Sequence, residues 1–207
     1  MQGAFHDGET VTFTIRNLSN QTKLYSFGMK PSFKEVGDSP WAPIPGPVSF
    51  ERAARPMPLD LPEHVEGSEN YELSFSFTFS SENDFRRVYF AYCEPHSYSD
   101  CQAYLNELER RFSQHSQIYF TRELLTHTLD SRRIDLITIT TYKDLLFERE
   151  SHIVGLFPEA KARPYKAKKP IIFISARVHP GEVPGSHILN GLLDFLTPAK
   201  AGTSQVR

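Results

Sequence analysis

Cysteine is scarce in this sequence, with two residues, Cys93 and Cys101, in a chain of 207. Two cysteines cannot supply the disulfide framework of a small secreted domain, so we expect free thiols in a reducing, cytoplasmic compartment. His96 lies between them, but the three residues lack the fourth ligand of a structural zinc site. We therefore expect no metal ion there.

A long apolar run, a secretory leader and a large charge imbalance are also missing. No apolar stretch approaches the ~20 residues that span a bilayer, and the first ten residues lack a basic segment followed by an apolar one. The formal net charge of −2 argues against a nucleic-acid binder. With 39% apolar and 13% aromatic residues, the chain has the composition of one large or two modest folded domains.

The first half of the chain carries the alternation of half-buried antiparallel strands. Apolar and polar residues alternate in residues 10–16, and residues 71–79 repeat the pattern with aromatic side chains that we assign to a core rather than to a binding surface. Residues 23–29 and 87–93 are two more expected strands, and the latter should pair with residues 71–79 in a hairpin. We predict an N-terminal antiparallel β-sandwich over residues 1–98.

Polar and proline-rich segments separate these strands. Residues 17–22 and 80–84 have turn compositions, and residues 31–62 hold eight of the fifteen prolines. Proline removes a backbone donor, so this stretch should be a surface loop without a central strand. Short extended pieces are expected near Trp41 and residues 48–50.

The second half changes to mixed helix and strand. Ser99 and Gln102 have capping-box spacing, and Leu105, Leu108 and Phe112 form the buried stripe of the helix that follows. Residues 118–125 and 134–140 are strands, joined through an Asp-Ser turn. Periodicity alone indicates a mixed α/β architecture over residues 99–207.

Residues 169–196 combine three elements in succession. Residues 171–174 form an apolar run typical of a buried strand, and the sequence His179-Pro180-Gly181-Glu182 then predicts a type II turn with glycine at positive φ. Pro184 suits the first turn of a helix. The apolar stripe that we expect this helix to bury is Ile188, Leu192, Phe195 and Leu196.

The turn places an imidazole and a carboxylate side by side. Zinc takes both donor types, so His179 and Glu182 are candidate metal ligands. The alternative is a polar turn that caps the next helix. His6 and Glu9 have the same spacing but belong to the surface, and we expect His187 to be a surface or packing residue of the helix rather than a third ligand.

At these residues the chain resembles a known family. The segment SARVHPGEVPGSHILNGLLDFL is similar to the zinc-binding segment of the cytosolic carboxypeptidases. The segments KLYSFGM and YFAYCEPHSYSDCQAYLNEL resemble the β-rich domain and linker that precede catalysis in this branch. The words KLYS and SYSDC resemble the subgroup that removes branch-point glutamate from modified tubulin.

The resemblance implies an N-terminal β-sandwich followed by the opening portion of an α/β zinc carboxypeptidase domain. It implies Zn²⁺ on His179 and Glu182, with glutamylated tubulin or other acidic protein tails as partners in the cytoplasm or on microtubules. The third ligand, the carboxylate-binding arginine and the catalytic glutamate are expected beyond Arg207. We therefore expect no catalytic residue within this chain and no peptidase activity from it alone.

Two other readings of the chain remain open. A non-catalytic module could bind tubulin or another partner through its β-domain, or the chain could be an unstable product with exposed core surface. Five cations within residues 161–169 form a solvated loop or steer an acidic substrate.

Overall fold

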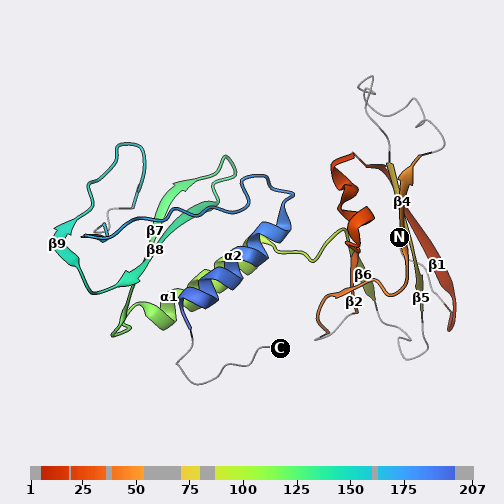
Figure 1. Cartoon of the computed structure of the whole chain (residues 1–207), viewed down its shortest axis with the longest axis horizontal. Helices are drawn as coiled ribbons and strands as arrows, with labels where there is room; N and C mark the ends of the chain where they lie inside the picture. Colours follow the sequence, from red (N-terminus) through yellow and green to blue (C-terminus); the bar gives the residue numbers. More distant parts are fainter. Residues whose placement is uncertain are drawn as a thin grey trace. The chain divides into compact units, whose positions relative to one another are not determined.

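The computed structural model describes residues 6–18, 20–35, 39–53, 71–79, 87–159 and 163–198. These residues are rich in β-strand, arranged in small sheets, with two α-helices in addition (Figure 1). The chain divides into two compact units, Met1–Pro95 and His96–Arg207. No helix in the described ranges is long and apolar enough to cross a membrane.

The first sheet of the Met1–Pro95 unit has the strand order β1-β5-β4, with antiparallel neighbours. Its strands are β1 (Thr10–Leu18), β5 (Tyr71–Thr78) and β4 (Val48–Arg52). The predictions of strands at residues 10–16 and 71–79 are therefore confirmed. On the exposed face, hydroxyl groups join β1 to β5 in three pairs, Thr10–Thr78, Thr12–Ser76 and Thr14–Ser74, each at 2.9 Å.

The second sheet has the order β3-β2-β6 and corrects two expectations. Its strands are β3 (Ala42–Pro43), β2 (Ser32–Glu35) and β6 (Val88–Ala91). The strand β6 pairs with β2, so the predicted hairpin between residues 71–79 and 87–93 is wrong, because β1 and β4 occupy both edges of β5. A central strand also lies in the proline-rich stretch, because β2 itself contains no proline. The expected turn at 80–84 lies outside the described residues.

Residues 23–29 do not form the predicted strand. They belong largely to a 3-10 helix, η1 (Asn20–Phe27), which buries Tyr25 and leaves Leu24 and Phe27 exposed. Gly28 follows at φ +93°, a conformation that glycine adopts without strain. In the described residues 24–29, buried and exposed side chains do not alternate as they do in a strand that packs one face against a core.

Aromatic side chains from both sheets share one core. Phe75 and Phe77 of β5 are buried with Ile44, and Phe33 of β2 and Phe90 of β6 pack against them. The stripe on β5 is therefore core, as predicted. Each layer contributes rings: Phe33 and Phe77 lie 5.1 Å apart, centroid to centroid.

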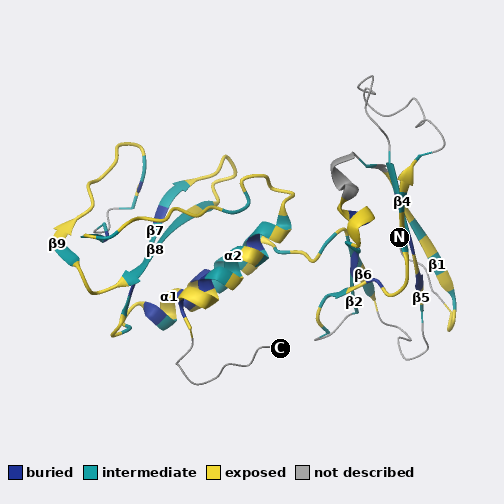
Figure 2. Ribbon diagram, viewed as in Figure 1, coloured by how far each residue is buried: buried dark blue, intermediate teal, exposed yellow. Residues whose placement is uncertain are grey.

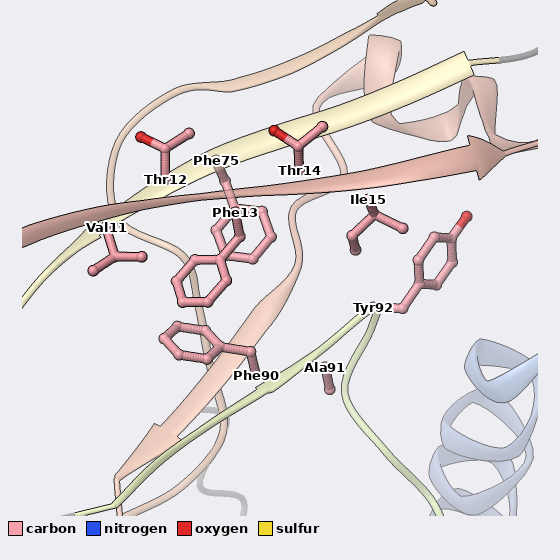
Figure 3. A pocket seen from close by; sticks show the side chains of 9 residues that line it. All are labelled: Val11, Thr12, Phe13, Thr14, Ile15, Phe75, Phe90, Ala91 and Tyr92. Carbon is pink, nitrogen blue, oxygen red and sulfur yellow. The ribbon is translucent and has the colours of Figure 1, made fainter. Parts of the chain in front are cut away.

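An apolar pocket of about 410 Å³ opens between β1 and β6. In Figure 3, Val11, Phe13 and Ile15 point toward Phe90 and Tyr92, whereas the threonines of β1 point away. The pocket is the open side of the aromatic core.

The His96–Arg207 unit starts with α1 (Tyr98–Phe112), whose cap differs from the expected one. Ser97 is the N-cap, and its hydroxyl accepts a hydrogen bond from the amide of Asp100, while the Asp100 carboxylate accepts from the Ser97 amide. The capping box therefore lies two residues before the predicted Ser99 and Gln102. Asp100, at the third helical position, accepts the hydrogen bond from the N-cap amide that Glu or Gln accepts in the usual capping box.

The strands predicted at residues 118–125 and 134–140 are confirmed as β7 (Ile118–His127) and β8 (Arg133–Thr141), which pair as an antiparallel hairpin. Ser131 turns the chain between them at φ +59°. One hydrophobic cluster joins this hairpin to both helices: Leu105, Leu108, Phe112, Phe120 and Leu193. The predicted buried stripe of α1 is confirmed.

We call residues 161–169 the cationic segment, and its described part, residues 163–169, contains a short strand. Strand β10 (Tyr165–Ala167) pairs with β9 (Leu145–Arg149), and Lys161 lies outside the described residues. Arg163 forms an ion pair with Glu123 at 2.6 Å, and Lys166 pairs with Glu148.

Residues 171–174 are not the buried strand that their composition predicts. They have no strand structure, and Ile171, Ile172 and Phe173 are 88%, 84% and 79% exposed (Figure 2). A strand covered on both faces needs neighbours that supply hydrogen bonds and apolar contacts. No strand in the described ranges lies beside this segment in a sheet.

Helix α2 (Val183–Leu196) buries a different face from the predicted one. Leu193 is buried and Leu189 packs beside it against the shared cluster, whereas Ile188 and Phe195 are 73% and 79% exposed. The helix carries apolar residues on two faces, so periodicity permits either. Contact with α1 selects the face of Leu189 and Leu193.

A buried ion pair joins the two strands of the hairpin, and Gln102 of α1 hydrogen-bonds to both of its members. Nη2 of Arg122 lies 3.0 Å from Oδ2 of Asp135, and these side chains are 6% and 2% exposed. Burial acts to raise the pKa of Asp135, but hydrogen bonds from Arg122 and Gln102 and the charge of Arg122 outweigh it, so this pKa lies below its ordinary value. The charged carboxylate therefore stabilises the fold.

Replacing Asp135 with Asn should lower the free energy of unfolding by about 3 kcal/mol at pH 7, because the buried Arg122 then keeps only the more distant and exposed carboxylate of Glu109 as counter-charge. Since the folded pKa is depressed, the stabilisation is present above the unfolded value of ~3.9 and disappears as pH falls through the folded value. Urea unfolding across this pH range measures the difference. Asp130→Asn, at an exposed turn position, is the matched control.

The two serines around the start of α1 provide a second test. Ser97→Ala should cost about 1 kcal/mol of unfolding free energy, because the Asp100 amide loses its acceptor. Ser99→Ala should have a smaller effect, since Ser99 lies inside the helix. Equal losses for the two variants, measured by urea unfolding, would contradict this cap assignment.

Candidate metal centre

His179 and Glu182 lie side by side at the start of α2. The distance from Nδ1 of His179 to Oε1 of Glu182 is 2.8 Å, and the amide of Glu182 donates to the carbonyl oxygen of His179 at 3.0 Å. We call residues 179–182 the HPGE turn. The predicted proximity of the imidazole and the carboxylate is present in the structure.

The type of this turn differs from the predicted one. Gly181 does not adopt a positive φ, so the turn is not type II. Pro180 at the second position suits a turn of type I equally well, since both types fix φ near −60° there. A Cβ atom added to Gly181 would meet nothing within 4 Å, so local sterics do not require glycine at this position.

The carboxylate of Glu182 is not committed to capping. Glu182 is the N-cap residue of α2 and Pro184 lies in the first turn, but the Glu182 side chain makes no capping hydrogen bond. It contacts the imidazole of His179 instead. The geometry therefore disfavours the alternative of a turn that only caps the helix.

The two side chains have the chemistry and access that a zinc ligand needs. Imidazole nitrogen and carboxylate oxygen are both zinc donors, and the side chains are 75% and 63% exposed. A zinc site that supports hydrolysis uses three protein ligands. In the described ranges no third His, Cys, Asp or Glu joins this pair in a metal-sized group. The pair fits as two of three ligands.

The other histidines named from the sequence lie elsewhere. The ring of His187 packs edge-on against the ring of His96, with centroids 5.3 Å apart, which confirms it as a packing residue of α2. At the second pair of the same spacing, Glu9 accepts from the backbone amide of His6 at 2.9 Å, and His6 is exposed, as expected. Cys93 and Cys101 are free thiols.

One residue beside the turn carries no sequence signal. Arg177 adopts φ +61° and directs its guanidinium at the carbonyl oxygen of Pro180. Left-handed backbone is uncommon outside glycine, asparagine and aspartate, so no composition rule predicts it at an arginine.

Comparison with curated proteins identifies relatives along nearly the whole chain, although no protein-family model matches it. Cytosolic carboxypeptidase-like protein 5 of Homo sapiens is 39% identical in an alignment of 200 positions that covers 91% of this chain. Cytosolic carboxypeptidase 6 of Caenorhabditis elegans is 33% identical over 192 residues, or 92% of the chain. The chain belongs to the cytosolic carboxypeptidase family. Human cytosolic carboxypeptidase 6, at 34% identity over 191 residues, is a further relative.

This family member matches a minor part of each relative. The match covers 21% of human cytosolic carboxypeptidase-like protein 5 and 31% of human cytosolic carboxypeptidase 6. It includes both units of the chain, because more than nine-tenths of the residues are aligned.

His179→Ala should lower the affinity of the 207-residue chain for zinc at least about tenfold, or ~1.4 kcal/mol, because one of two adjacent donors is lost. Calorimetric titration with zinc measures it. His6→Ala removes a histidine of the same His-x-x-Glu spacing and should leave the affinity unchanged. Equal losses in both variants would indicate scattered surface binding instead of a centre.

Proposed function

We propose that this chain is part of a zinc metallocarboxypeptidase that removes C-terminal or branch-point glutamate from glutamylated proteins such as tubulin. The observation that carries the proposal is the 2.8 Å contact between His179 and Glu182, in a chain 39% identical to human cytosolic carboxypeptidase-like protein 5. The contact supplies two donors of the right kind, and the identity supplies the family.

The proposed chemistry requires the chain to hold a metal and leave it accessible. Zinc, when bound, lowers the pKa of a water molecule to ~7 and polarises the scissile carbonyl group. His179 and Glu182 would hold it from the first and fourth positions of one turn, which a backbone hydrogen bond between these two residues closes. Their exposure leaves room for a third ligand and for a protein tail.

We assign no general base to the described residues. The carboxylate of Glu182 is a ligand in this proposal, so it is not available to take a proton from water. The chain by itself is therefore expected to be inactive.

The cationic segment contributes little to recognition of an acidic tail. Arg163 and Lys166 form ion pairs with Glu123 and Glu148, which cancel most of their field at a distance. The Lys169 ammonium donates to the hydroxyl and carbonyl oxygens of Thr141. We place the contacts that select glutamate outside this segment.

The proposed domain organisation follows the family. Residues 1–98 would form a β-sandwich, which the shared aromatic core of the two sheets supports. Residues 99–207 would open the α/β carboxypeptidase domain. The relatives are named cytosolic, and we propose the cytoplasm, including microtubules, as the place of action.

The activity test uses a peptide with C-terminal glutamates and measures free glutamate. The 207-residue chain with zinc should release none above a protein-free blank. In the native polypeptide that contains this segment, Glu182→Gln should lower kcat/KM at least ~100-fold, in keeping with the loss of a metal ligand. Glu9→Gln, the matched control, should leave it within about twofold. Release of glutamate by the 207-residue chain would contradict the assignment of the missing groups.

A further inference from the structure

We propose that Arg177 is a positioning residue that holds the HPGE turn in the conformation in which His179 and Glu182 bind the metal. The inference rests on the proposed metal-binding role of these two residues. Arg177 is half-buried two residues before His179, whereas both ligands are exposed. Residues that do not bind the metal commonly orient the residues that do, through hydrogen bonds.

Two hydrogen bonds join Arg177 to the centre of the turn. Nε and Nη2 of Arg177 donate to the carbonyl oxygen of Pro180 at 3.0 and 2.7 Å. Hydrogen bonds from a charged donor are stronger than neutral ones. They fix the peptide group between Pro180 and Gly181, which lies midway between the two ligands.

Two further hydrogen bonds join the same guanidinium to residues at the start of α1 and α2. Nη1 donates to the carbonyl oxygen of His96 at 3.0 Å and to the hydroxyl of Ser186 at 3.2 Å. Ser186 is buried in the first turn of α2, and His96 immediately precedes the N-cap of α1. One side chain therefore ties the turn to the start of both helices.

The backbone of Arg177 is strained, so its conformation depends on these contacts. A side chain with a Cβ atom is strained at φ +61°, and such residues persist where surrounding interactions determine their conformation. The left-handed residue directs the chain out of the extended segment and into the turn.

The number of donors separates this role from substrate binding. A guanidinium has five N–H groups, and four hydrogen bonds to acceptors of the chain itself use four of them. Little capacity is left for a substrate carboxylate, which Arg usually binds with two parallel N–H groups.

The test compares Arg177→Ala and Arg177→Lys with Arg110→Ala in the 207-residue chain. Arg110 pairs with Glu107 on the exposed face of α1 and is the matched control. Without metal, Arg177→Ala should raise the exchange rate of the Glu182 amide hydrogen about tenfold, because the turn opens more often. The affinity of the Arg177→Ala variant for zinc should fall about 10–100-fold, although His179 and Glu182 both remain.

Arg177→Lys should give intermediate values, because one ammonium cannot reproduce the planar fork. Arg110→Ala should change neither quantity. An unchanged Glu182 exchange rate in Arg177→Ala would overturn the inference, whatever the zinc result. If the original chain bound no zinc, the proposed function would fail while the exchange measurement still decided the role of Arg177.

A folding defect is checked by urea unfolding of every variant. If Arg177→Ala does not fold, Ser186→Ala replaces it, because this change removes one of the four hydrogen bonds that Arg177 donates and retains the guanidinium. Faster Glu182 exchange with an unchanged unfolding midpoint would support positioning. Exchange that follows global unfolding alone would overturn it.

Discussion

The packing of α2 along α1 is the constraint on which the candidate metal centre depends. Leu193 enters the cluster around Leu108, and the Tyr104 hydroxyl lies 3.0 Å from the carbonyl oxygen of Asn190 and 2.8 Å from Oδ1 of Asp194. These contacts fix the axis and rotation of α2, and its first residue follows Glu182 directly. The position of the HPGE turn is thus set by apolar contacts well along the helix, while Arg177 sets its conformation.

The sequence predicted strands better than their partners. Alternation marks β1 and β5 because a period of two decides which side chains face the core, wherever the neighbouring strand comes from. Pairing is a different matter, since β5 contacts a strand about 60 residues earlier and leaves β6 to the other sheet. Local rules also missed η1, where Tyr25 is the buried side chain among the described residues 24–27 and gives no periodic signal.

In the candidate site, too, local features could be predicted from the sequence and long-range contacts could not. The approach of His179 to Glu182 was predictable because it depends on a turn closed between residues three apart. The exposure of residues 171–174 and the buried face of α2 were not predictable, because both depend on which surfaces cover these residues. The contacts of Arg177 were not predictable either, because its partners His96 and Ser186 lie far from each other in the sequence. The assignment of zinc stays a prediction.

The hydroxyl pairs between β1 and β5 have a consequence for the order of folding. They join residues 60 to 68 positions apart, whereas β7 and β8 meet across a short turn. Closing the longer loop costs more chain entropy before any contact is gained, so the hairpin should form earlier than the first sheet. During synthesis β1 leaves the ribosome before its partner β5. Until β5 follows, the threonine hydroxyls on one face of β1 can hydrogen-bond to water.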